Sequence, residues 1–160
     1  MSTPLRVMIV EDEAVIQMQL EMLLEDAGHI VVATAFSAEE AIADAHRTRP
    51  DVVFVDMRLR GRSSGLDVVD AIRAIEGTII VFVTANAADL DEECDGAAAV
   101  IAKPFSVGVI EESLRYIEEC VHRPPPEAKR PLGLRVAPSY DAHLESFRRP
   151  QSGSDRGAQF

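Results

Sequence analysis

The chain has 160 residues, 47% of them hydrophobic, which suits one globular domain with a buried core and some excess length. Residues 1–121 carry 9 Lys and Arg against 23 Asp and Glu, whereas residues 122–160 carry 7 against 4. An acidic body argues against non-specific nucleic-acid binding by the folded part. No apolar run reaches the roughly 18 residues of a membrane span, and the first residues lack the apolar segment of a signal peptide.

The two cysteines, Cys94 and Cys120, lie far apart in the sequence and form no C-x-x-C pattern. The four histidines show no metal-ligand spacing with these cysteines. We therefore expect neither a zinc site nor a disulfide framework. We expect two reduced thiols in a cytoplasmic protein that does not bind membranes.

Strand-like and helix-like segments alternate five times before residue 122. The predicted strands are residues 6–10, 29–35, 52–55, 79–83 and 98–102. The predicted helices are residues 14–27, 37–49, 66–75, 87–94 and 106–121. Ser37, with Glu40 three residues later, has a capping-box pattern, and Ser106 is a second expected N-cap. This alternation predicts a parallel sheet with helices on both faces.

The pattern changes at His122, because Arg123 and the three prolines after it cannot continue a helix. We expect residues 1–121 to be one domain and residues 122–160 to be a Pro/Arg-rich extension. Disorder is one prediction for the extension, since it has few apolar residues. A second prediction stays open: Tyr140, Leu144 and Phe147 have helical spacing, with Ser139 as cap, and could dock on the chain itself or on a partner.

Four of the predicted strands end on side chains that suit phosphoryl chemistry. Glu11 and Asp12 follow the first strand, Asp56 follows the third, Thr84 follows the fourth and Lys103 follows the fifth. Because the ends of parallel strands gather at one sheet edge, we expect these groups to meet there. Each of these residues alone is common in a loop after a strand, but their occurrence at four strand ends favours a shared site.

Carboxylates crowded at one edge repel each other unless a cation joins them, and Mg²⁺ prefers such oxygen ligands. With a metal present, Asp56 can act as the nucleophile that forms an aspartyl phosphate. Lys103 supplies a mobile positive charge for one phosphate oxygen, and Thr84 offers a hydroxyl donor to another. The sequence therefore predicts phosphoryl transfer at this edge of the sheet.

Over about residues 4–121 the chain resembles the receiver domain of bacterial two-component response regulators. The resemblance rests on the segments 8–13, 53–59, 81–85 and 101–105, with sequences MIVEDE, VFVDMRL, VFVTA and IAKPF. It implies a flavodoxin-like (βα)5 doubly wound fold with strand order 2-1-3-4-5. It also implies transfer of a phosphoryl group from a kinase phosphohistidine to Asp56.

The resemblance further implies that Asp12 and Asp56 are direct Mg²⁺ ligands with the Arg58 backbone carbonyl, and that Glu11 acts through a metal-bound water. Two departures from the family pattern concern this region and the readout of activation. Glu11 stands where Asp is commoner, and Val100 stands where receivers usually carry Tyr or Phe. The usual aromatic switch is therefore not expected here.

Residues 122–160 are too few and too poor in apolar periodicity for a helix-turn-helix output domain. We therefore expect a stand-alone response regulator, a phosphoprotein that is no enzyme beyond its own phosphorylation and dephosphorylation. Its expected partners are a sensor histidine kinase or phosphotransfer protein, a downstream protein target and a second copy in a homodimer. The alternatives are a pseudo-receiver that binds partners without phosphorylation and a flavodoxin-like cofactor binder. The latter would want a phosphate-cradling loop where the acidic residues 11–13 stand.

Overall fold

The computed structural model describes residues 3–61 and 64–148. They form a sheet in the order β2-β1-β3-β4-β5-β6, with β6 antiparallel to β5 and the other pairs parallel. The predicted α/β flavodoxin-like fold and the order of its five strands are confirmed, and one strand is added. Within the described part of the chain, no helix has the length and apolar character needed to cross a membrane.

The first five strands and most helices lie within a few residues of their predicted bounds. The strands are β1 (Arg6–Val10), β2 (Ile30–Ala35), β3 (Val52–Val55), β4 (Ile79–Thr84), β5 (Ala99–Ala102) and β6 (Leu134–Val136). The helices are α1 (Ala14–Asp26), α2 (Ala38–Thr48), α3 (Gly65–Ile72), α4 (Val107–His122) and α5 (Pro138–Glu145). Two 3₁₀ turns, η1 (Ala87–Asp89) and η2 (Cys94–Gly96), lie between β4 and β5.

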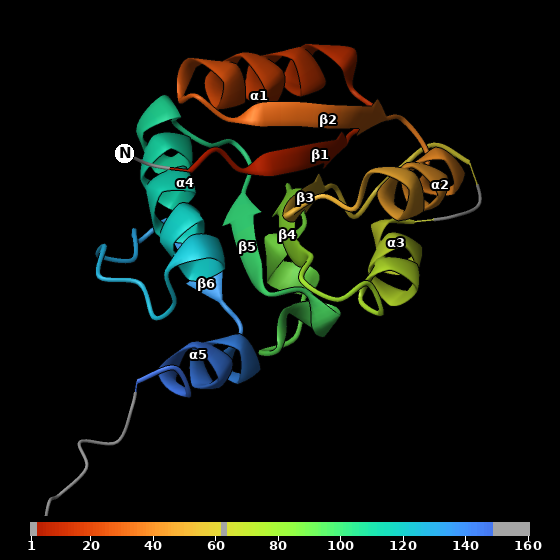
Figure 1. The fold of residues 1–160 in the computed structure, drawn as a ribbon. Coiled ribbons are helices and arrows are strands. Elements are labelled where there is room, and N and C mark those ends of the chain that lie inside the picture. The colour runs from red at the N-terminus through yellow and green to blue at the C-terminus, as the bar shows by residue number, and fades with distance from the viewer. Residues whose placement is uncertain (1–2, 62–63, 149–160) are drawn as a thin grey trace, which may run out of the picture.

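The sheet lies between two helical layers, with α1 and α4 on one face and α2 and α3 on the other (Figure 1). Successive strand residues point to opposite faces, so each strand serves both layers. In β1, Val7 and Ile9 pack into the cluster that contains α1 and α4, while Met8 and Val10 pack into the other. The central strands β3 and β4 are therefore apolar at every position before Thr84, as expected for a sheet covered on both sides.

Serine side chains begin three of the helices. Ser37 accepts a hydrogen bond from the Glu40 backbone N–H at 3.3 Å, and Ser106 accepts one from Val109 at 3.1 Å, so both predicted N-caps are confirmed. The full capping box occurs at α3 instead, where Ser64 and Asp67 bond reciprocally. These caps fix where each helix starts relative to the strand end before it.

The predicted helix over residues 87–94 is wrong. The segment makes two short 3₁₀ turns, and the backbone at Cys94 and Asp95 has positive φ angles of 55° and 46°. An α-helix is interrupted at Leu90, whose backbone is extended with a ψ angle of 144°, and again at the left-handed Cys94 and Asp95. The acidic composition suggested a helix, but the chain is instead folded tightly over Leu90 and Cys94, which are both buried.

We call residues 123–148 the strap. The prediction of disorder does not describe its residues 134–145, which form β6 and α5, and the helix expected around Tyr140 and Leu144 is present. Ser139 as its cap is wrong, because α5 begins at Pro138 with Ala137 in the N-cap position. The last part of the predicted extension, residues 149–160, lies outside the described residues.

Candidate functional site

The carboxyl ends of four parallel strands meet at one edge of the sheet, as the sequence predicted. Val10 of β1 lies opposite Val55 of β3, and Thr84 of β4 lies opposite Ala102 of β5. The backbone pairing continues one residue further, because the Asp56 N–H donates to the Val10 carbonyl and the Lys103 N–H donates to the Thr84 carbonyl. The side chains that follow these strands are therefore held by the sheet itself rather than by free loops.

Three carboxylates gather at this edge. One oxygen from each of Glu11, Asp12 and Asp56 lies within 4.8 Å of the other two. Glu11 and Asp56 are buried, with only 2% and 7% of their surface exposed, whereas Asp12 is half-buried. Like charges held so close in a partly dry place need a countercharge.

Lys103 supplies that countercharge. Its Nζ donates a hydrogen bond to Asp56 Oδ2 at 2.9 Å and another to Glu11 Oε1. Burial raises the pKa of Glu11 to about 7 despite the ammonium, which acts in the opposite direction. Burial would by itself lower the pKa of Lys103, but the hydrogen bonds to Asp56 and Glu11 outweigh it, and the pKa is raised. The ammonium therefore stays charged between the two acids.

Thr84 and Arg58 stand beside this cluster. The fully buried Thr84 hydroxyl accepts a hydrogen bond from the Asn86 N–H at 3.1 Å, which leaves its own proton free to be donated. The Arg58 backbone N–H lies 3.4 Å from Asp56 Oδ1, and the Arg58 side chain is exposed. The predicted roles of Thr84 in phosphate binding and of the Arg58 carbonyl as a metal ligand stay predictions.

Two residues that the sequence reasoning missed shape the site. A Cβ on Gly65 would lie 2.1 Å from the Asp56 carbonyl oxygen, so α3 can start this close to β3 only with glycine there. The buried Gln17 lies with its Nε2 3.4 Å from the Glu11 and Ala35 carbonyl oxygens and so ties α1 to the ends of β1 and β2. Gly65 could have been recognised as a glycine just before the apolar face of a predicted helix. Nothing in the sequence distinguished Gln17.

The donor set fits Mg²⁺. Hard divalent cations prefer oxygen ligands, and Mg²⁺ uses one or two carboxylates together with waters and phosphate oxygens. Glu11, Asp12 and Asp56 provide carboxylate oxygens on one side, and exposure of Asp12 leaves that side open to solvent. Binding of a metal and of a phosphoryl group by these residues and Lys103 stays a prediction.

Val100, at the position that the family pattern gives to an aromatic residue, is buried. Its side chain belongs to the cluster under α2 and α3, together with Phe82 and Cys94. Phe105 packs into the opposite cluster, under α1 and α4. Phe105 therefore does not take the place of Val100, and the lack of the usual aromatic switch stays a prediction.

Comparison with known proteins identifies the family. Residues 7–115 match the model of the response regulator receiver domain. The chain belongs to the response regulator receiver family. It is 37% identical over 109 residues to the transcriptional regulatory protein PdtaR of Mycobacterium tuberculosis, an alignment that covers 66% of this chain and 53% of PdtaR.

Further relatives of this receiver include the phyllosphere-induced regulator PhyR of Methylorubrum extorquens, 38% identical over 101 residues, with 62% of this chain and 38% of PhyR covered. Among solved structures, the PhyR receiver domain of Erythrobacter litoralis superposes with a TM-score of 0.68 at 28% identity, covering 76% of this chain and 95% of that domain. The chain thus spans about half the length, or less, of the curated relatives named here.

Proposed function

We propose that this receiver belongs to a cytoplasmic response regulator and accepts a phosphoryl group onto Asp56 from a sensor histidine kinase or a phosphotransfer protein. The observation that carries the proposal is the position of Asp56. Its carboxylate is buried at the end of β3, hydrogen-bonded to the Lys103 ammonium and within 4.8 Å of oxygens from Glu11 and Asp12. The family match over residues 7–115 supports the same reading.

In the proposed step, a carboxylate oxygen of Asp56 attacks the phosphorus of a phosphohistidine. The new O–P bond forms as the P–N bond breaks, and the imidazole leaves with the electron pair and takes up a proton. Lys103, which pairs with Asp56, would bind one phosphoryl oxygen, and the Thr84 hydroxyl would donate its proton to another. Both groups would act where negative charge gathers in the transition state.

We also propose that the site binds Mg²⁺ as a cofactor. Asp12, Asp56 and the Arg58 backbone carbonyl would be direct ligands, and Glu11 would bind the ion through a water molecule. When bound, Mg²⁺ would screen the repulsion between the Asp56 carboxylate and the incoming phosphate. The role of this chain's residues is to keep three carboxylates preorganised at one sheet edge, which Gly65 and the β1–β3 pairing accomplish. Output would then be contact with a downstream protein, or with a second copy, and no other enzymatic activity is proposed.

Intact-mass measurement tests the proposal. After incubation with Mg²⁺ and acetyl phosphate, the wild-type chain should gain the mass of one phosphoryl group. Asp56→Asn, nearly isosteric but a poor nucleophile, should gain none while its circular dichroism stays unchanged. Asp67→Asn is the matched control, since Asp67 caps α3 outside the cluster, and it should be phosphorylated like the wild type.

Two results would contradict this function. A phosphoryl increment on Asp56→Asn would move the phosphosite elsewhere. A wild-type chain that gains no mass with either acetyl phosphate or a phosphorylated histidine phosphotransfer protein would instead favour a pseudo-receiver, which binds partners without phosphorylation.

A further inference from the structure

The strap covers the open edge of the sheet. In β6, Leu134 lies opposite Ile101, Arg135 opposite Val100, and Val136 opposite Ala99, and the Ala137 N–H extends the pairing to the Ala98 carbonyl at 2.9 Å. Without β6, strand β5 would present its unpaired backbone groups to solvent. Such an edge is a ready template for another extended segment. Which extended segments bind the β5 edge then depends on their side chains.

The side chains on the two faces of β6 lie in different surroundings. Leu134 and Val136 are buried in the cluster under α1 and α4. Arg135 points to the other side, where its Nη2 donates to the Asp91 carbonyl at 3.2 Å. That side is acidic, since the segment 89–95 carries five Asp and Glu and no Lys or Arg occurs between residues 86 and 102. The apolar–basic–apolar pattern of β6 thus meets a buried apolar surface on one face and an acidic segment on the other.

The strap folds only because it is docked. Helix α5 has eight residues, of which Leu144 is buried, and a helix this short is unstable alone in water. Ala137 cannot cap it, and the cap comes from Glu93, whose Oε2 accepts the Ser139 N–H at 3.1 Å. Figure 1 shows β6 and α5 as the outermost elements beyond β5. A segment that is ordered by contacts with the rest of the fold, and not by its own, can open locally without unfolding of the whole domain.

We propose that the β5 edge, together with the acidic segment 89–95, is a binding surface for an extended apolar–basic–apolar segment of a partner protein, and that Leu134–Val136 of the strap is its intramolecular occupant. The strap is then a reversible cover: a partner strand with the same pattern replaces it and makes the same ladder. This inference goes beyond the proposed phosphotransfer and does not depend on it.

Cys120 allows the opening of the strap to be measured in the wild-type chain. The thiol is buried beside Tyr116 and Tyr140, the latter on α5, and burial raises its pKa to about 12. Since the thiolate is the reactive form, labelling requires that the strap first move away. The rate of N-ethylmaleimide labelling, assigned to Cys120 by mass spectrometry of its peptide, can be compared with the rate that global unfolding in urea would allow.

We expect Cys120 to be labelled roughly tenfold or more faster than global unfolding permits, with little dependence on urea at low concentration. Leu134→Ala should speed the labelling roughly 30-fold or more, the usual effect of removing a buried leucine. Leu132→Ala is the matched control, because Leu132 is fully exposed two residues earlier, and it should leave the rate unchanged. Labelling of the wild type only at the rate of global unfolding would overturn the proposal and make β6 a permanent strand.

A peptide tests the occupant. A fluorescent peptide with the sequence of residues 130–148 should bind full-length Leu134→Asp, whose own strap cannot dock, and bind the wild type more weakly because the tethered strap competes. A peptide carrying Arg135→Glu should bind roughly tenfold or more weakly, since it faces the acidic segment. Equal binding of the two peptides, or no binding to a folded Leu134→Asp chain, would refute the proposal. Exchange of straps into a stable dimer, seen by light scattering, would assign the surface to a second copy and overturn the foreign partner.

Discussion

Lys103 determines the charge balance of the candidate site. Its ammonium lies between Asp56 and Glu11, and its side chain is 10% exposed. In this arrangement the lysine provides the positive charge that a metal ion would otherwise bring. The Lys103 ammonium, which neutralises these carboxylates, also repels a divalent metal ion. Binding of the metal and the position of the ammonium therefore oppose each other.

We predict that Lys103→Met lowers the stability of the metal-free protein and enlarges the stabilisation by Mg²⁺. Removing one partner of a largely buried ion pair costs about 3 kcal/mol, because the other charges stay behind unpaired. Mg²⁺ should restore part of that loss, through binding to the folded state alone. Thermal unfolding in EDTA and in millimolar Mg²⁺ measures both effects.

Lys129→Met is the control, since Lys129 is exposed on the strap and should leave both melting temperatures unchanged. A Mg²⁺-dependent rise in melting temperature that is no larger in Lys103→Met than in the wild type would show that the lysine and the metal do not compete. In Asp12→Ala the rise should be mostly lost in either background, because a carboxylate of the cluster is gone.

At the residue scale, the sequence located the members of the cluster but not their contacts. Glu11, Asp12, Asp56, Thr84 and Lys103 were predictable because each follows an apolar strand, and parallel strands end at one edge. The hydrogen bond of Lys103 to Glu11 was not predictable, since it depends on side-chain rotamers between groups 92 residues apart. The predicted partner of that lysine was phosphate alone.

At the scale of single elements, the start of α3 is coupled to the end of β3 through Gly65. The Gly65 N–H donates to the Met57 carbonyl at 2.8 Å, and a Cβ at Gly65 would overlap the Asp56 carbonyl oxygen. The helix therefore holds the backbone on which the predicted phosphoacceptor stands.

Gly65→Ala should lower the free energy of unfolding by roughly 2 kcal/mol and slow phosphorylation of Asp56, because the strand end must shift to make room. Gly108→Ala is the matched control: the nearest atom to its Cβ would be Ser106 Oγ at 3.9 Å, and alanine is the better helix former. Urea unfolding and the rate of mass gain with acetyl phosphate measure the two effects. A Gly65→Ala chain as stable and as reactive as Gly108→Ala would show that this close approach is not needed.

Strand β6 was not predicted from the sequence, and helix α5 was predicted only as one of two alternatives for the strap. β6 has three residues, too few for an alternating pattern to stand out, and its place is decided by the free edge of β5. Helix α5 is capped by Glu93, which lies 46 residues from Ser139 in the chain. Both depend on tertiary contacts, so the composition of the strap left disorder open beside the docking helix that its apolar spacing indicated. The long apolar strands and amphipathic helices carry their own periodicity and were predictable.

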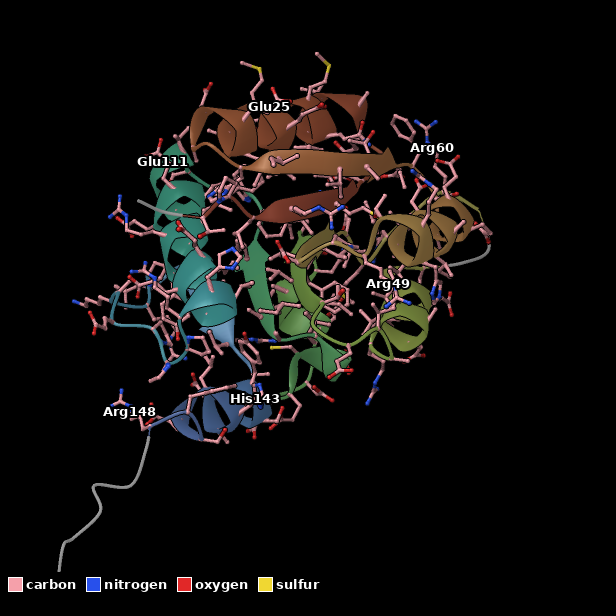
Figure 2. All side chains as sticks on the ribbon, viewed as in Figure 1. Glu25, Arg49, Arg60, Glu111, His143 and Arg148 are labelled. Carbon is pink, nitrogen blue, oxygen red and sulfur yellow. The ribbon has the colours of Figure 1, made fainter. Side chains whose placement is uncertain are left out.

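At the scale of the whole molecule, the strap and the site lie apart but share two segments. Figure 2 shows His143 on α5, and Arg148 just after this helix, at the end of the molecule away from Arg60, which follows β3. Strand β5 leads from β6 to Lys103. The chain after Thr84 leads through the buried Leu90 to Asp91, whose carbonyl accepts the hydrogen bond from Arg135. A change at either end can therefore reach the other through packed elements.

Phosphorylation should loosen the strap. If the Thr84 side chain rotates as a whole to bring its hydroxyl to a phosphoryl oxygen on Asp56, its oxygen moves away from the Asn86 N–H, and the turn that leads to Asp91 is released. The Arg135 anchor then weakens. Coupling between two sites typically changes an affinity by about 5- to 150-fold. With Mg²⁺ and acetyl phosphate, we expect Cys120 in the wild type to be labelled at least about fivefold faster, in step with the mass gain at Asp56. Asp56→Asn under the same conditions should show no acceleration. A phosphorylated wild type with an unchanged Cys120 rate would show that the strap opens independently of the site, because the mass gain and the labelling are read from the same sample.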